Sequence, residues 1–479
     1  MKAILFLSPL LLTVVTCSTW VCIFTSTEDM FNGAYRHQAD TYRAVQLLIY
    51  SGFPKDHIFY MSPDNAIDSL DNPTFGYLFT EPGCDARDVT YNVTVNYSGS
   101  QVNKTNFKRF IGFRNITNGN ILDINISEND TIIYYIVGHG DTGTIYMKDS
   151  YIYYDDIIEG MEKLLFSHHY LHIYFFIDTC KAGSLFSHDS FSQFVYLQRF
   201  NQSFEHDINV ISATNATHNS FGMYCGIHSI LNTLVCDKCL TDVFSKRWMD
   251  FIQFGMGNET MREMFNEVKA RVTESPVTAY GRWEEAAWNR TIADVFNIGE
   301  YNPFINILDP IYWSCLNGST SSPIQDYTSS PPLYGSRRLK DTSLNRQIAF
   351  DINRKRQVAL QTYINSHPEW KNMNVKRELT RLKNLELRSK AFTGSDKQQF
   401  MQLYNKEKKM IHDIDAWEIS FKKKYANITF GPTDVREWDC FHKIVEKFDK
   451  KFGHSVYGMS RFYYLATLCN HDKNSYKDF

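Results

Sequence analysis

The segment from Thr131 to Ser184 decides the fold: TIIYYIVGHGDTGTIYMKDSYIYYDDIIEGMEKLLFSHHYLHIYFFIDTCKAGS. Residues 131–137 and 171–177 are short, continuous apolar runs, which are typical of strands buried on both faces. Between them, apolar residues repeat at helical spacing, which predicts an amphipathic helix over 154–167. A crossover helix of this kind requires the two strands to run parallel. The segment therefore predicts an α/β fold with a mostly parallel sheet flanked by helices.

Each of these strands ends in a polar turn that contains a candidate catalytic side chain. His139 lies between Gly138 and Gly140 after the first strand, and Cys180 follows the second. Because open α/β sheets bind ligands beyond the carboxyl ends of their strands, we expect both side chains on exposed turns at one crevice. A thiol beside a base is the arrangement of nucleophilic catalysis, and the Gly140 and Cys180 amides are candidates for an oxyanion hole. The alternative is a buried, inert Cys and a structural His; the joint geometry favours catalysis.

Six short motifs extend this pattern over most of the chain: AYRHQAD (34–40), DNPTFG (71–76), GHGDTG (138–143), IDTCKAGS (177–184), NSFGMYC (219–225) and CLTD (239–242). Together they resemble the legumain family of caspase-fold cysteine endopeptidases, which cleave after Asn and, in acid, after Asp. The resemblance implies that Cys180 is the nucleophile and His139 the base.

The resemblance also implies a pocket for the Asn side chain of the substrate. Its residues would be Arg36, His37, Asp178, Asn219, Ser220 and Asp242. Arg36 would donate hydrogen bonds to the side-chain carbonyl of Asn, and Asp242 would accept one from its amide. A structural salt bridge between Arg36 and Asp242 is an alternative that is compatible with this role.

Three positions depart from the family pattern. Ala34 stands where the family has an Asn that orients the catalytic His, and Asn32 or a backbone carbonyl is the candidate substitute. Cys and His alone can suffice because a thiol ionises readily. Gly138 replaces an Asp of animal legumains, and Asp178 replaces a Glu, which predicts a slightly wider pocket or a differently held Arg36.

The N-terminus and the sequons indicate an exported protein. Residues 1–17 carry Lys2, an apolar run and then small residues, which predicts a cleaved signal peptide; no later run is long and apolar enough to span a membrane. The chain has twelve N-x-S/T sequons. These features favour the secretory pathway, with a lysosome, a vacuole or the extracellular space as the destination.

Ten cysteines in an exported chain favour disulfides. Four residues have the spacing C-x2-H-x7-C-x2-C, which could bind zinc: Cys225, His228, Cys236 and Cys239. The resemblance to plant vacuolar legumains instead implies a Cys225–Cys239 disulfide, and we favour it; the family also implies a Cys440–Cys469 disulfide. No pairing is predicted for Cys84, Cys236 or Cys315. No metal or cofactor is expected.

The resemblance implies a protease domain over 18–310 and a helical, death-domain-like prodomain over 346–479. Composition marks the Ser- and Pro-rich segment between them, 311–345, as an exposed linker, and we expect helices near 341–366, 371–390, 395–424, 434–452 and 455–469. Residues 1–330 have a net charge of −15 and residues 331–479 a net charge of +12, within a total of −3. This split favours docking of the prodomain on the protease domain over nucleic-acid binding.

The segment RRLKDTSLN (337–345) resembles the segment in which legumains cut themselves. The resemblance implies acid-dependent cleavage after Asp341, with Asn345 as the alternative. The sequence thus predicts the zymogen of an asparaginyl endopeptidase acting on peptides or proteins. Two rivals stay open: a transamidase or peptide ligase that resolves the same acyl-enzyme with an amine, and a pseudoprotease, which Ala34 suggests.

Overall fold

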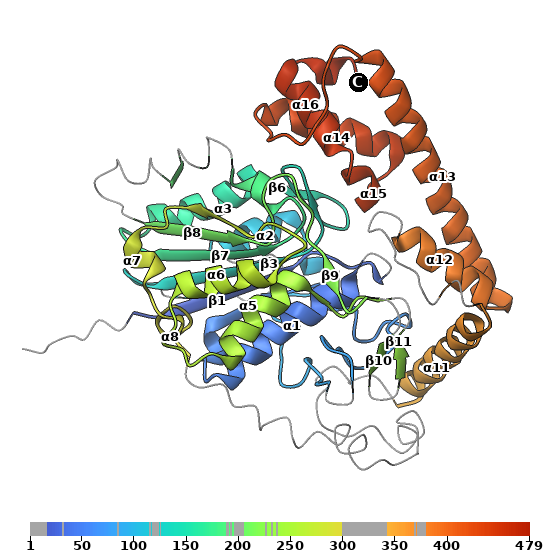
Figure 1. The fold of residues 1–479 in the computed structure, drawn as a ribbon, viewed down its shortest axis with the longest axis horizontal. Helices are drawn as coiled ribbons and strands as arrows, with labels where there is room; N and C mark the ends of the chain where they lie inside the picture. The colour runs from blue at the N-terminus through green and yellow to red at the C-terminus, as the bar shows by residue number, and fades with distance from the viewer. Residues whose placement is uncertain are drawn as a thin grey trace, which may run out of the picture.

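The computed structural model describes residues 17–30, 33–83, 86–114, 116, 124, 126–187, 191, 194–195, 206–225, 228–230, 233–235, 238–298, 343–367, 370 and 380–479. Almost all of the expected signal peptide, most of the expected linker, Asp341, Asn32, Cys84, Cys236 and Cys315 lie outside these residues. The described chain consists of a sheet-centred part up to residue 298 and a helical part from residue 343 (Figure 1).

A six-stranded sheet forms the centre of the first part. Its strand order is β13-β8-β7-β3-β1-β2. The strands are β1 (Thr19–Thr25), β2 (Ile58–Met61), β3 (Thr131–Val137), β7 (His172–Asp178), β8 (Asp207–Ser212) and β13 (Thr278–Gly281). All neighbours pair in parallel except β13, which runs antiparallel to β8 at one edge. This arrangement confirms the predicted mostly parallel α/β sheet.

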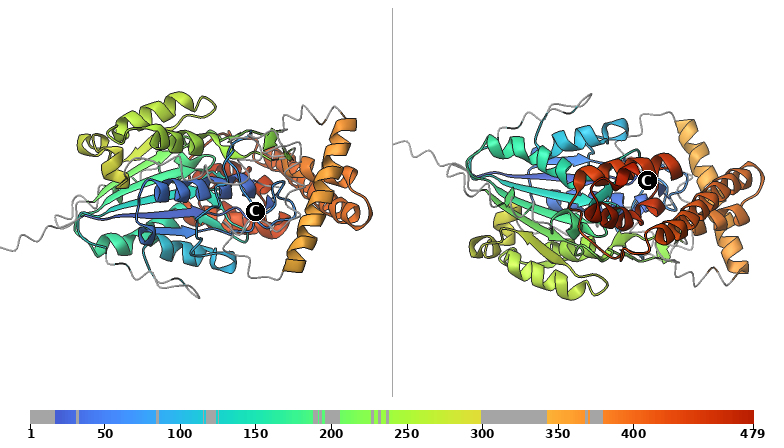
Figure 2. Two further views of the ribbon diagram at one scale, coloured as in Figure 1. Left: turned by 90° about the horizontal axis from the view of Figure 1, so that it is seen from below. Right: turned by 90° about the horizontal axis from the view of Figure 1, so that it is seen from above.

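Helices cover both faces of the sheet (Figure 2). One face packs against α1 (Ala34–Tyr50), α5 (Val243–Phe254), α6 (Met261–Arg271) and α8 (Ile292–Phe296), and the other against α2 (Lys104–Ile111) and α3 (Tyr154–Phe166). Successive residues of β3 alternate between the two cores, as the two-residue period of a strand requires. Because both faces are buried, the strand reads as a continuous apolar run.

A small antiparallel sheet was not predicted. It contains β4 (Gly140–Asp141), β5 (Thr144–Tyr146) and β6 (Tyr151–Tyr153), and it lies between β3 and α3. Its strands are two or three residues long, too short for a periodic signal. The sheet begins directly after His139, whose carbonyl accepts a hydrogen bond from the Tyr146 N–H at 2.8 Å. This sheet therefore fixes the turn that holds the candidate base.

The part from residue 343 is helical, as predicted. Its helices are α11 (Ser343–Ser366), α12 (Thr380–Ala391), α13 (Gly394–Lys424), α14 (Trp438–Phe452), α15 (Val456–Met459) and α16 (Phe462–His471). The last predicted helix is in fact two, and α14 begins four residues late. The Asn470 side chain accepts from the Arg436 N–H and donates to the Asp434 carbonyl, so the residues before α14 use their polar groups outside a helix.

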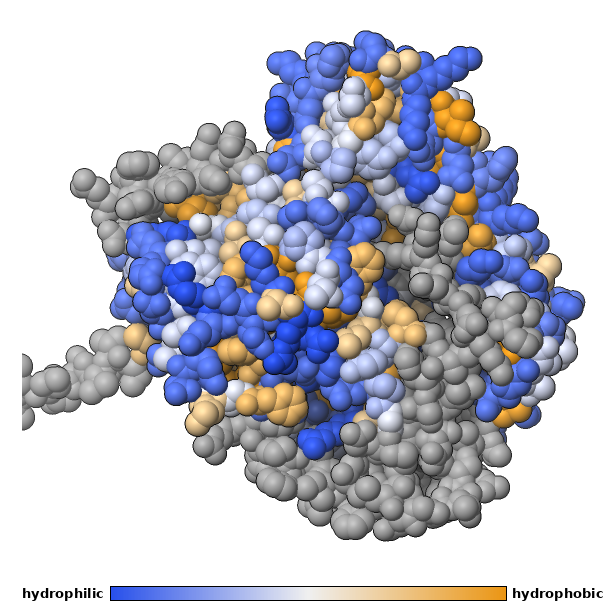
Figure 3. All heavy atoms as spheres, in the orientation of Figure 1, coloured by the Kyte–Doolittle hydropathy of each residue, from blue (hydrophilic) through white to orange (hydrophobic). Residues whose placement is uncertain are grey.

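These helices surround the side of the molecule at which the parallel strands end (Figure 1). Helices α13–α16 share one hydrophobic core with Tyr151 and Tyr153 of β6. A second, smaller core joins α11, α12 and the start of α13. In the face shown in Figure 3, hydrophilic residues cover most of the surface of both parts. Within the described residues, no helix has the length and apolarity needed to cross a membrane.

Candidate active site

The turns after β3 and β7 lie against each other. A Cβ atom on Gly140 would come within 2.6 Å of the Cys180 carbonyl oxygen and 2.7 Å of the Thr179 hydroxyl oxygen. Since real Cβ atoms do not approach other atoms this closely, only glycine fits at position 140. A side chain on Gly138 would collide with the Ser26 hydroxyl. The parallel pairing of β3 with β7 thus places the two predicted turns at one edge.

Cys180 lies beneath the loop that contains Ser220. The Cys180 Sγ accepts a hydrogen bond from the Ser220 N–H at 2.8 Å and donates to the Ser220 carbonyl at 3.3 Å. The first contact favours the thiolate and the second favours the thiol. Only 1% of Cys180 and 3% of His139 is exposed, so the expectation of exposed turns was wrong. Sequence patterns identify a sheet edge but not the loops and helices that fold over it.

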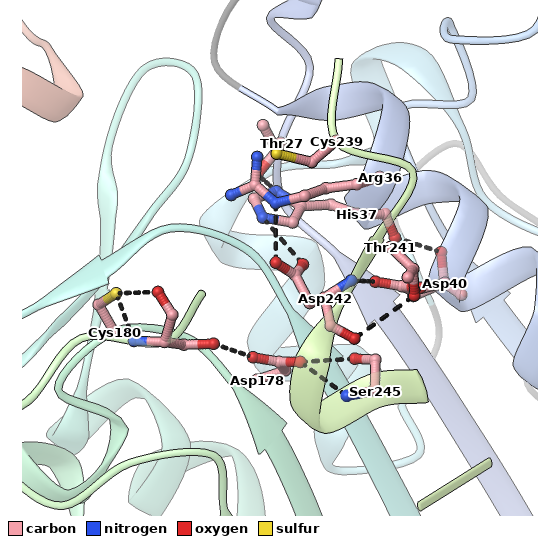
Figure 4. A network of polar contacts seen from close by, with 12 residues as sticks. Thr27, Arg36, His37, Asp40, Asp178, Cys180, Cys239, Thr241, Asp242 and Ser245 are labelled. Carbon is pink, nitrogen blue, oxygen red and sulfur yellow. Dashed lines mark hydrogen bonds and ion pairs between the residues drawn. The ribbon is translucent and has the colours of Figure 1, made fainter. Parts of the chain in front are cut away.

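Arg36 and His37 converge on Asp242 from the start of α1 (Figure 4). Arg36 Nε donates to Asp242 Oδ1 at 2.7 Å. The His37 Nε2 atom lies 3.4 Å from Asp242 Oδ2, and its Nδ1 atom is 2.7 Å from the Thr27 hydroxyl. The rings of His37 and His139 meet edge to face, with centroids 4.8 Å apart. His37 is therefore the link between the Arg36–Asp242 pair and the candidate base.

Two short strands hold Asp242 in place. β12 (Thr241–Asp242) pairs antiparallel with β9 (Gly222–Met223). A Cβ on Gly222 would approach the Arg36 side chain to 3.2 Å and Cys239 to 3.0 Å. Cys239 forms a disulfide with Cys225, which anchors the loop that carries Asp242. Gly222 thus leaves room for the Cδ atom of Arg36.

Asp178, the last residue of β7, is bound by hydroxyl groups. It accepts hydrogen bonds from the Ser220 hydroxyl at 2.6 Å and from the Ser245 hydroxyl at 2.6 Å. The Ser245 N–H adds a third, at 3.1 Å. Ser220 therefore contacts both the candidate nucleophile and Asp178, and the predicted pocket and the predicted thiol belong to one network (Figure 4).

Asp40 and Thr241 belong to this network but were not predicted as site residues. Asp40 is fully buried and accepts hydrogen bonds from the Thr241 hydroxyl and, at 2.8 Å, from the Asp242 N–H. Asp40 follows Arg36 by four residues, so both project from the same face of α1. That spacing within RHQAD is the signal that could have identified it.

Three carboxyl groups are buried here beside one guanidinium. Burial raises the pKa of Asp242 to about 7; the Arg36 guanidinium lowers this pKa and the Asp178 carboxylate raises it. Burial, together with the charge on Asp242, raises the pKa of Asp40 well above its usual range. Burial also raises the pKa of Asp178, against its hydroxyl partners. The site therefore favours keeping some of its carboxyl groups protonated near neutral pH.

The remaining predicted residues have simpler surroundings. Asn219 is half-buried next to Ser220. Ala34 is the first residue of α1, fully buried, and its N–H donates to the Asp29 carbonyl. Asn345 lies in the first turn of α11, with its side chain outside the description. The disulfide excludes Cys225 and Cys239 from zinc binding, and Cys440 is bonded to Cys469. No group of possible metal ligands occurs among the described residues.

Comparison with known proteins matches residues 19–292 to the peptidase C13 family. The chain is 27% identical over 263 residues to a vacuolar-processing enzyme of Vicia sativa, covering 54% of this chain and 50% of that protein. It is 30% identical to the β-isozyme of this enzyme from Arabidopsis thaliana, covering 50% and 48%. It is 26% identical to legumain of Bos taurus, covering 55% and 56%.

The chain spans about half the length of these curated relatives. Among solved structures, caspase-1 from Spodoptera frugiperda aligns with 55% of this chain and 88% of that chain, at 10% identity and a TM-score of 0.30.

The raised pKa of Asp242 makes a prediction about stability. Because the folded state holds this proton more tightly than the unfolded chain, the free energy of unfolding should fall as pH rises from about 4, the ordinary Asp value, to about 7. Asp242→Asn carries no charge at any pH and should lose this component. The unfolding temperature of Asp242→Asn minus that of wild type, measured by calorimetry, should therefore increase as pH rises across that range. Asp56→Asn, at an exposed site, is the control; parallel curves for Asp242→Asn and wild type would contradict the assignment.

Proposed function

The chain belongs to the peptidase C13 family, and from this membership and the geometry of the site we propose that it is a cysteine endopeptidase that cleaves after Asn, and after Asp in acid. The observation that carries the proposal is the largely buried Arg36–Asp242 pair. Asp178, whose charge acts on Asp242, is hydrogen-bonded to Ser220, and Ser220 is hydrogen-bonded to Cys180. A hydrogen-bond donor and an acceptor held side by side match a carboxamide, which offers one carbonyl and one NH2 group.

In this proposal Cys180 attacks the scissile carbonyl carbon and His139 takes the thiol proton. The carbonyl oxygen becomes an oxyanion, which the Gly140 and Cys180 amides stabilise. His139 then gives its proton to the leaving amine as the C–N bond breaks, and a thioester remains on Cys180. Water, deprotonated by His139, cleaves the thioester. An amine in place of water would give ligation, so product analysis separates these two outcomes.

Specificity follows from the unused hydrogen-bonding capacity of the pair. Arg36 donates a hydrogen bond from its Nε to Asp242. In this proposal its two terminal nitrogens donate to the side-chain carbonyl of the substrate Asn. Within the described part of the chain, Asp242 Oδ2 accepts no hydrogen bond, and His37 Nε2 lies 3.4 Å from it. A substrate amide could donate a hydrogen bond to this oxygen. An ionised substrate Asp would place a carboxylate against Asp242, whereas a protonated Asp has both an acceptor and a donor, so cleavage after Asp requires acid.

The helical part serves as an inhibitory prodomain in this proposal. Val435 and Trp438 pack on Gly143, since a Cβ there would lie 2.8 and 2.9 Å from their side chains. Asp434 accepts a hydrogen bond from the Ser187 hydroxyl at 2.8 Å. These contacts cover the hairpin that follows His139 and the turn that follows Cys180. A substrate chain could not pass there while α14 is in place.

A second set of contacts joins α11 and α12 to the loops that follow β1 and β2. Arg388, which is fully buried, donates to Asp71 at 2.6 Å, and Arg381 pairs with Asp29. Asn353 donates to the Leu70 and Asn72 carbonyls, each at 2.8 Å. The basic prodomain and the acidic protease domain thus meet through these ion pairs.

Since some relatives are named vacuolar-processing enzymes, an acidic vacuole or lysosome is the compartment proposed for release of the prodomain.

The nucleophile is tested by Cys180→Ser, which is nearly isosteric. This variant should keep the wild-type unfolding temperature and lose hydrolysis of an Asn-containing peptide, followed by mass spectrometry after acid treatment. His139→Gln should lose hydrolysis as well. Cys22→Ala removes a second buried free thiol and should retain activity. Full activity in Cys180→Ser would rule out the mechanism, and absence of any hydrolysis in wild type would favour the pseudoprotease.

The pocket is tested by Arg36→Ala. Leaving a buried carbonyl without its donor costs roughly 1 to 3 kcal/mol, so kcat/KM for Asn peptides should fall roughly tenfold or more. Arg36→Lys keeps the charge but not the planar fork and should recover only part of the loss. Arg262→Ala, at an exposed ion pair on α6, is the matched control. Unchanged cleavage after Asn in Arg36→Ala would show that the pocket lies elsewhere.

Prodomain release is tested by Asp71→Asn, which removes the carboxylate that Arg388 contacts. Removing this ion pair weakens docking, so the variant should release its prodomain at higher pH than wild type. N-terminal sequencing should find a fragment that starts at Thr342 or Arg346, absent from Cys180→Ser incubated alone. Asp56→Asn should behave as wild type; equal release from Cys180→Ser would show that another protease cuts the chain.

A further inference from the structure

Directly after the candidate nucleophile, a lysine forms a buried ion pair with the turn that holds the candidate base. Lys181 Nζ lies 2.6 Å from Asp141 Oδ1, and the side chains are only 12% and 7% exposed. Asp141 is the second residue of β4 and follows His139 by two positions. The pair therefore joins the two segments on which the proposed chemistry depends, and neither residue has a part in that chemistry.

The backbone fixes Lys181 in this position. Its φ angle is +49°, in the left-handed region that residues other than glycine seldom adopt. Its N–H donates to the His218 carbonyl at 2.8 Å, and its carbonyl accepts from the Ser184 N–H at 2.8 Å and from the Ser184 hydroxyl at 2.6 Å. Such a conformation persists only where the surroundings hold it. The direction of the lysine side chain is thus set by the fold.

Two further contacts connect the same segments. The Gly143 N–H donates to the Ser184 hydroxyl at 2.8 Å, and Gly140 packs on the Cys180 carbonyl. These neutral contacts already hold the two turns together. An ion pair adds a different property, because a charge beside a thiol changes how readily the thiol ionises.

Charged and titratable groups surround the pair on several elements. Asp141 Oδ1 also accepts from the Thr142 N–H at 2.7 Å. The Tyr463 ring of α16 lies over Lys181 Nζ, 5.3 Å from the ring centroid to the nitrogen. His139 precedes β4, Asp178 ends β7, and the side chain of His218 is bound to Asn215 instead of the pair. Lys181 is thus the charged residue next to Cys180 in the sequence, and Asp141 is the acidic residue nearest in the sequence to His139.

We propose that Lys181 and Asp141 are positioning residues that act as one neutral unit, so that neither charge acts alone on the Cys180 thiol. The proposal rests on the proposed role of Cys180 as nucleophile. An unpaired Lys181 would stabilise the thiolate and an unpaired Asp141 would destabilise it. While the pair is intact, the opposite effects of its two charges on the pKa of the Cys180 thiol cancel.

The test is a double-mutant cycle on thiol ionisation in the full-length protein. The ultraviolet absorbance of the thiolate is titrated against pH for wild type, Asp141→Asn, Lys181→Met and the double variant, each minus the same protein carrying Cys180→Ser. Asp141→Asn should lower the midpoint and Lys181→Met should raise it, each by at least about half a pH unit. The double variant should return towards wild type, and Lys181→Arg, which keeps the charge, should retain the wild-type midpoint.

A purely structural pair gives a different result. Both single variants would then lower the unfolding temperature without moving the midpoint, or would move it in the same direction, and either outcome overturns the proposal. If Lys181→Met does not fold, Asp141→Asn alone decides, because its midpoint must fall. Hydrolysis of an Asn peptide is measured separately. Opposite shifts of the midpoint without hydrolysis would reject the proposed function and support the ion-pair inference. Hydrolysis without shifts of the midpoint would support the proposed function and reject the ion-pair inference.

Discussion

The parallel pairing of β3 with β7 is the constraint on which the rest of the structure depends. Thr131–Val137 and His172–Asp178 pair residue for residue, so both strands end at the same level of the sheet. The turns that follow cannot avoid one another, and Gly140 packs directly on the Cys180 carbonyl. Every other contact at the site is added to this one: the Ser220 loop over the thiol, the hairpin after His139 and the C-terminal helices over that hairpin.

The second constraint is the burial of like charges. Asp40, Asp178 and Asp242 lie close to one Arg36, and desolvation works against ionising any of the three carboxyl groups. Such an arrangement costs stability, because buried charges without partners are unfavourable. Hydroxyl and backbone donors offset part of that cost. Among the described residues, Asp242 Oδ2 accepts no hydrogen bond and lies 3.4 Å from His37 Nε2, and the proposed carboxamide pocket would use this oxygen as its acceptor.

Much of this could be predicted from the sequence, and what could not has identifiable causes. Apolar runs at 131–137 and 171–177 indicated the central strands, because strands buried on both faces leave that pattern. The motifs predict that Arg36 and Asp242 belong to one pocket, and the two side chains lie in contact. The strands β4–β6 are too short to show a period, and Asp40 was overlooked because its partners come from a distant segment. The burial of Cys180 and His139 depends on elements that fold over the sheet edge, which local patterns do not reveal.

The helical part contacts the sheet-centred part at two separate places, and α13 joins them. Helices α14 and α16 contact the turns after His139 and Cys180, while α11 and α12 contact the loops at Asp29 and Asp71. At 31 residues, α13 is about 46 Å long, a stiff spacer between the two attachments. Binding is thus bivalent: when one attachment opens, the other keeps it at high effective concentration and it closes again. Cutting the chain before α11 would leave both attachments in place. The helical part would then dissociate only when both attachments are open at the same moment. A condition that weakens each attachment slightly would therefore increase the rate of dissociation steeply.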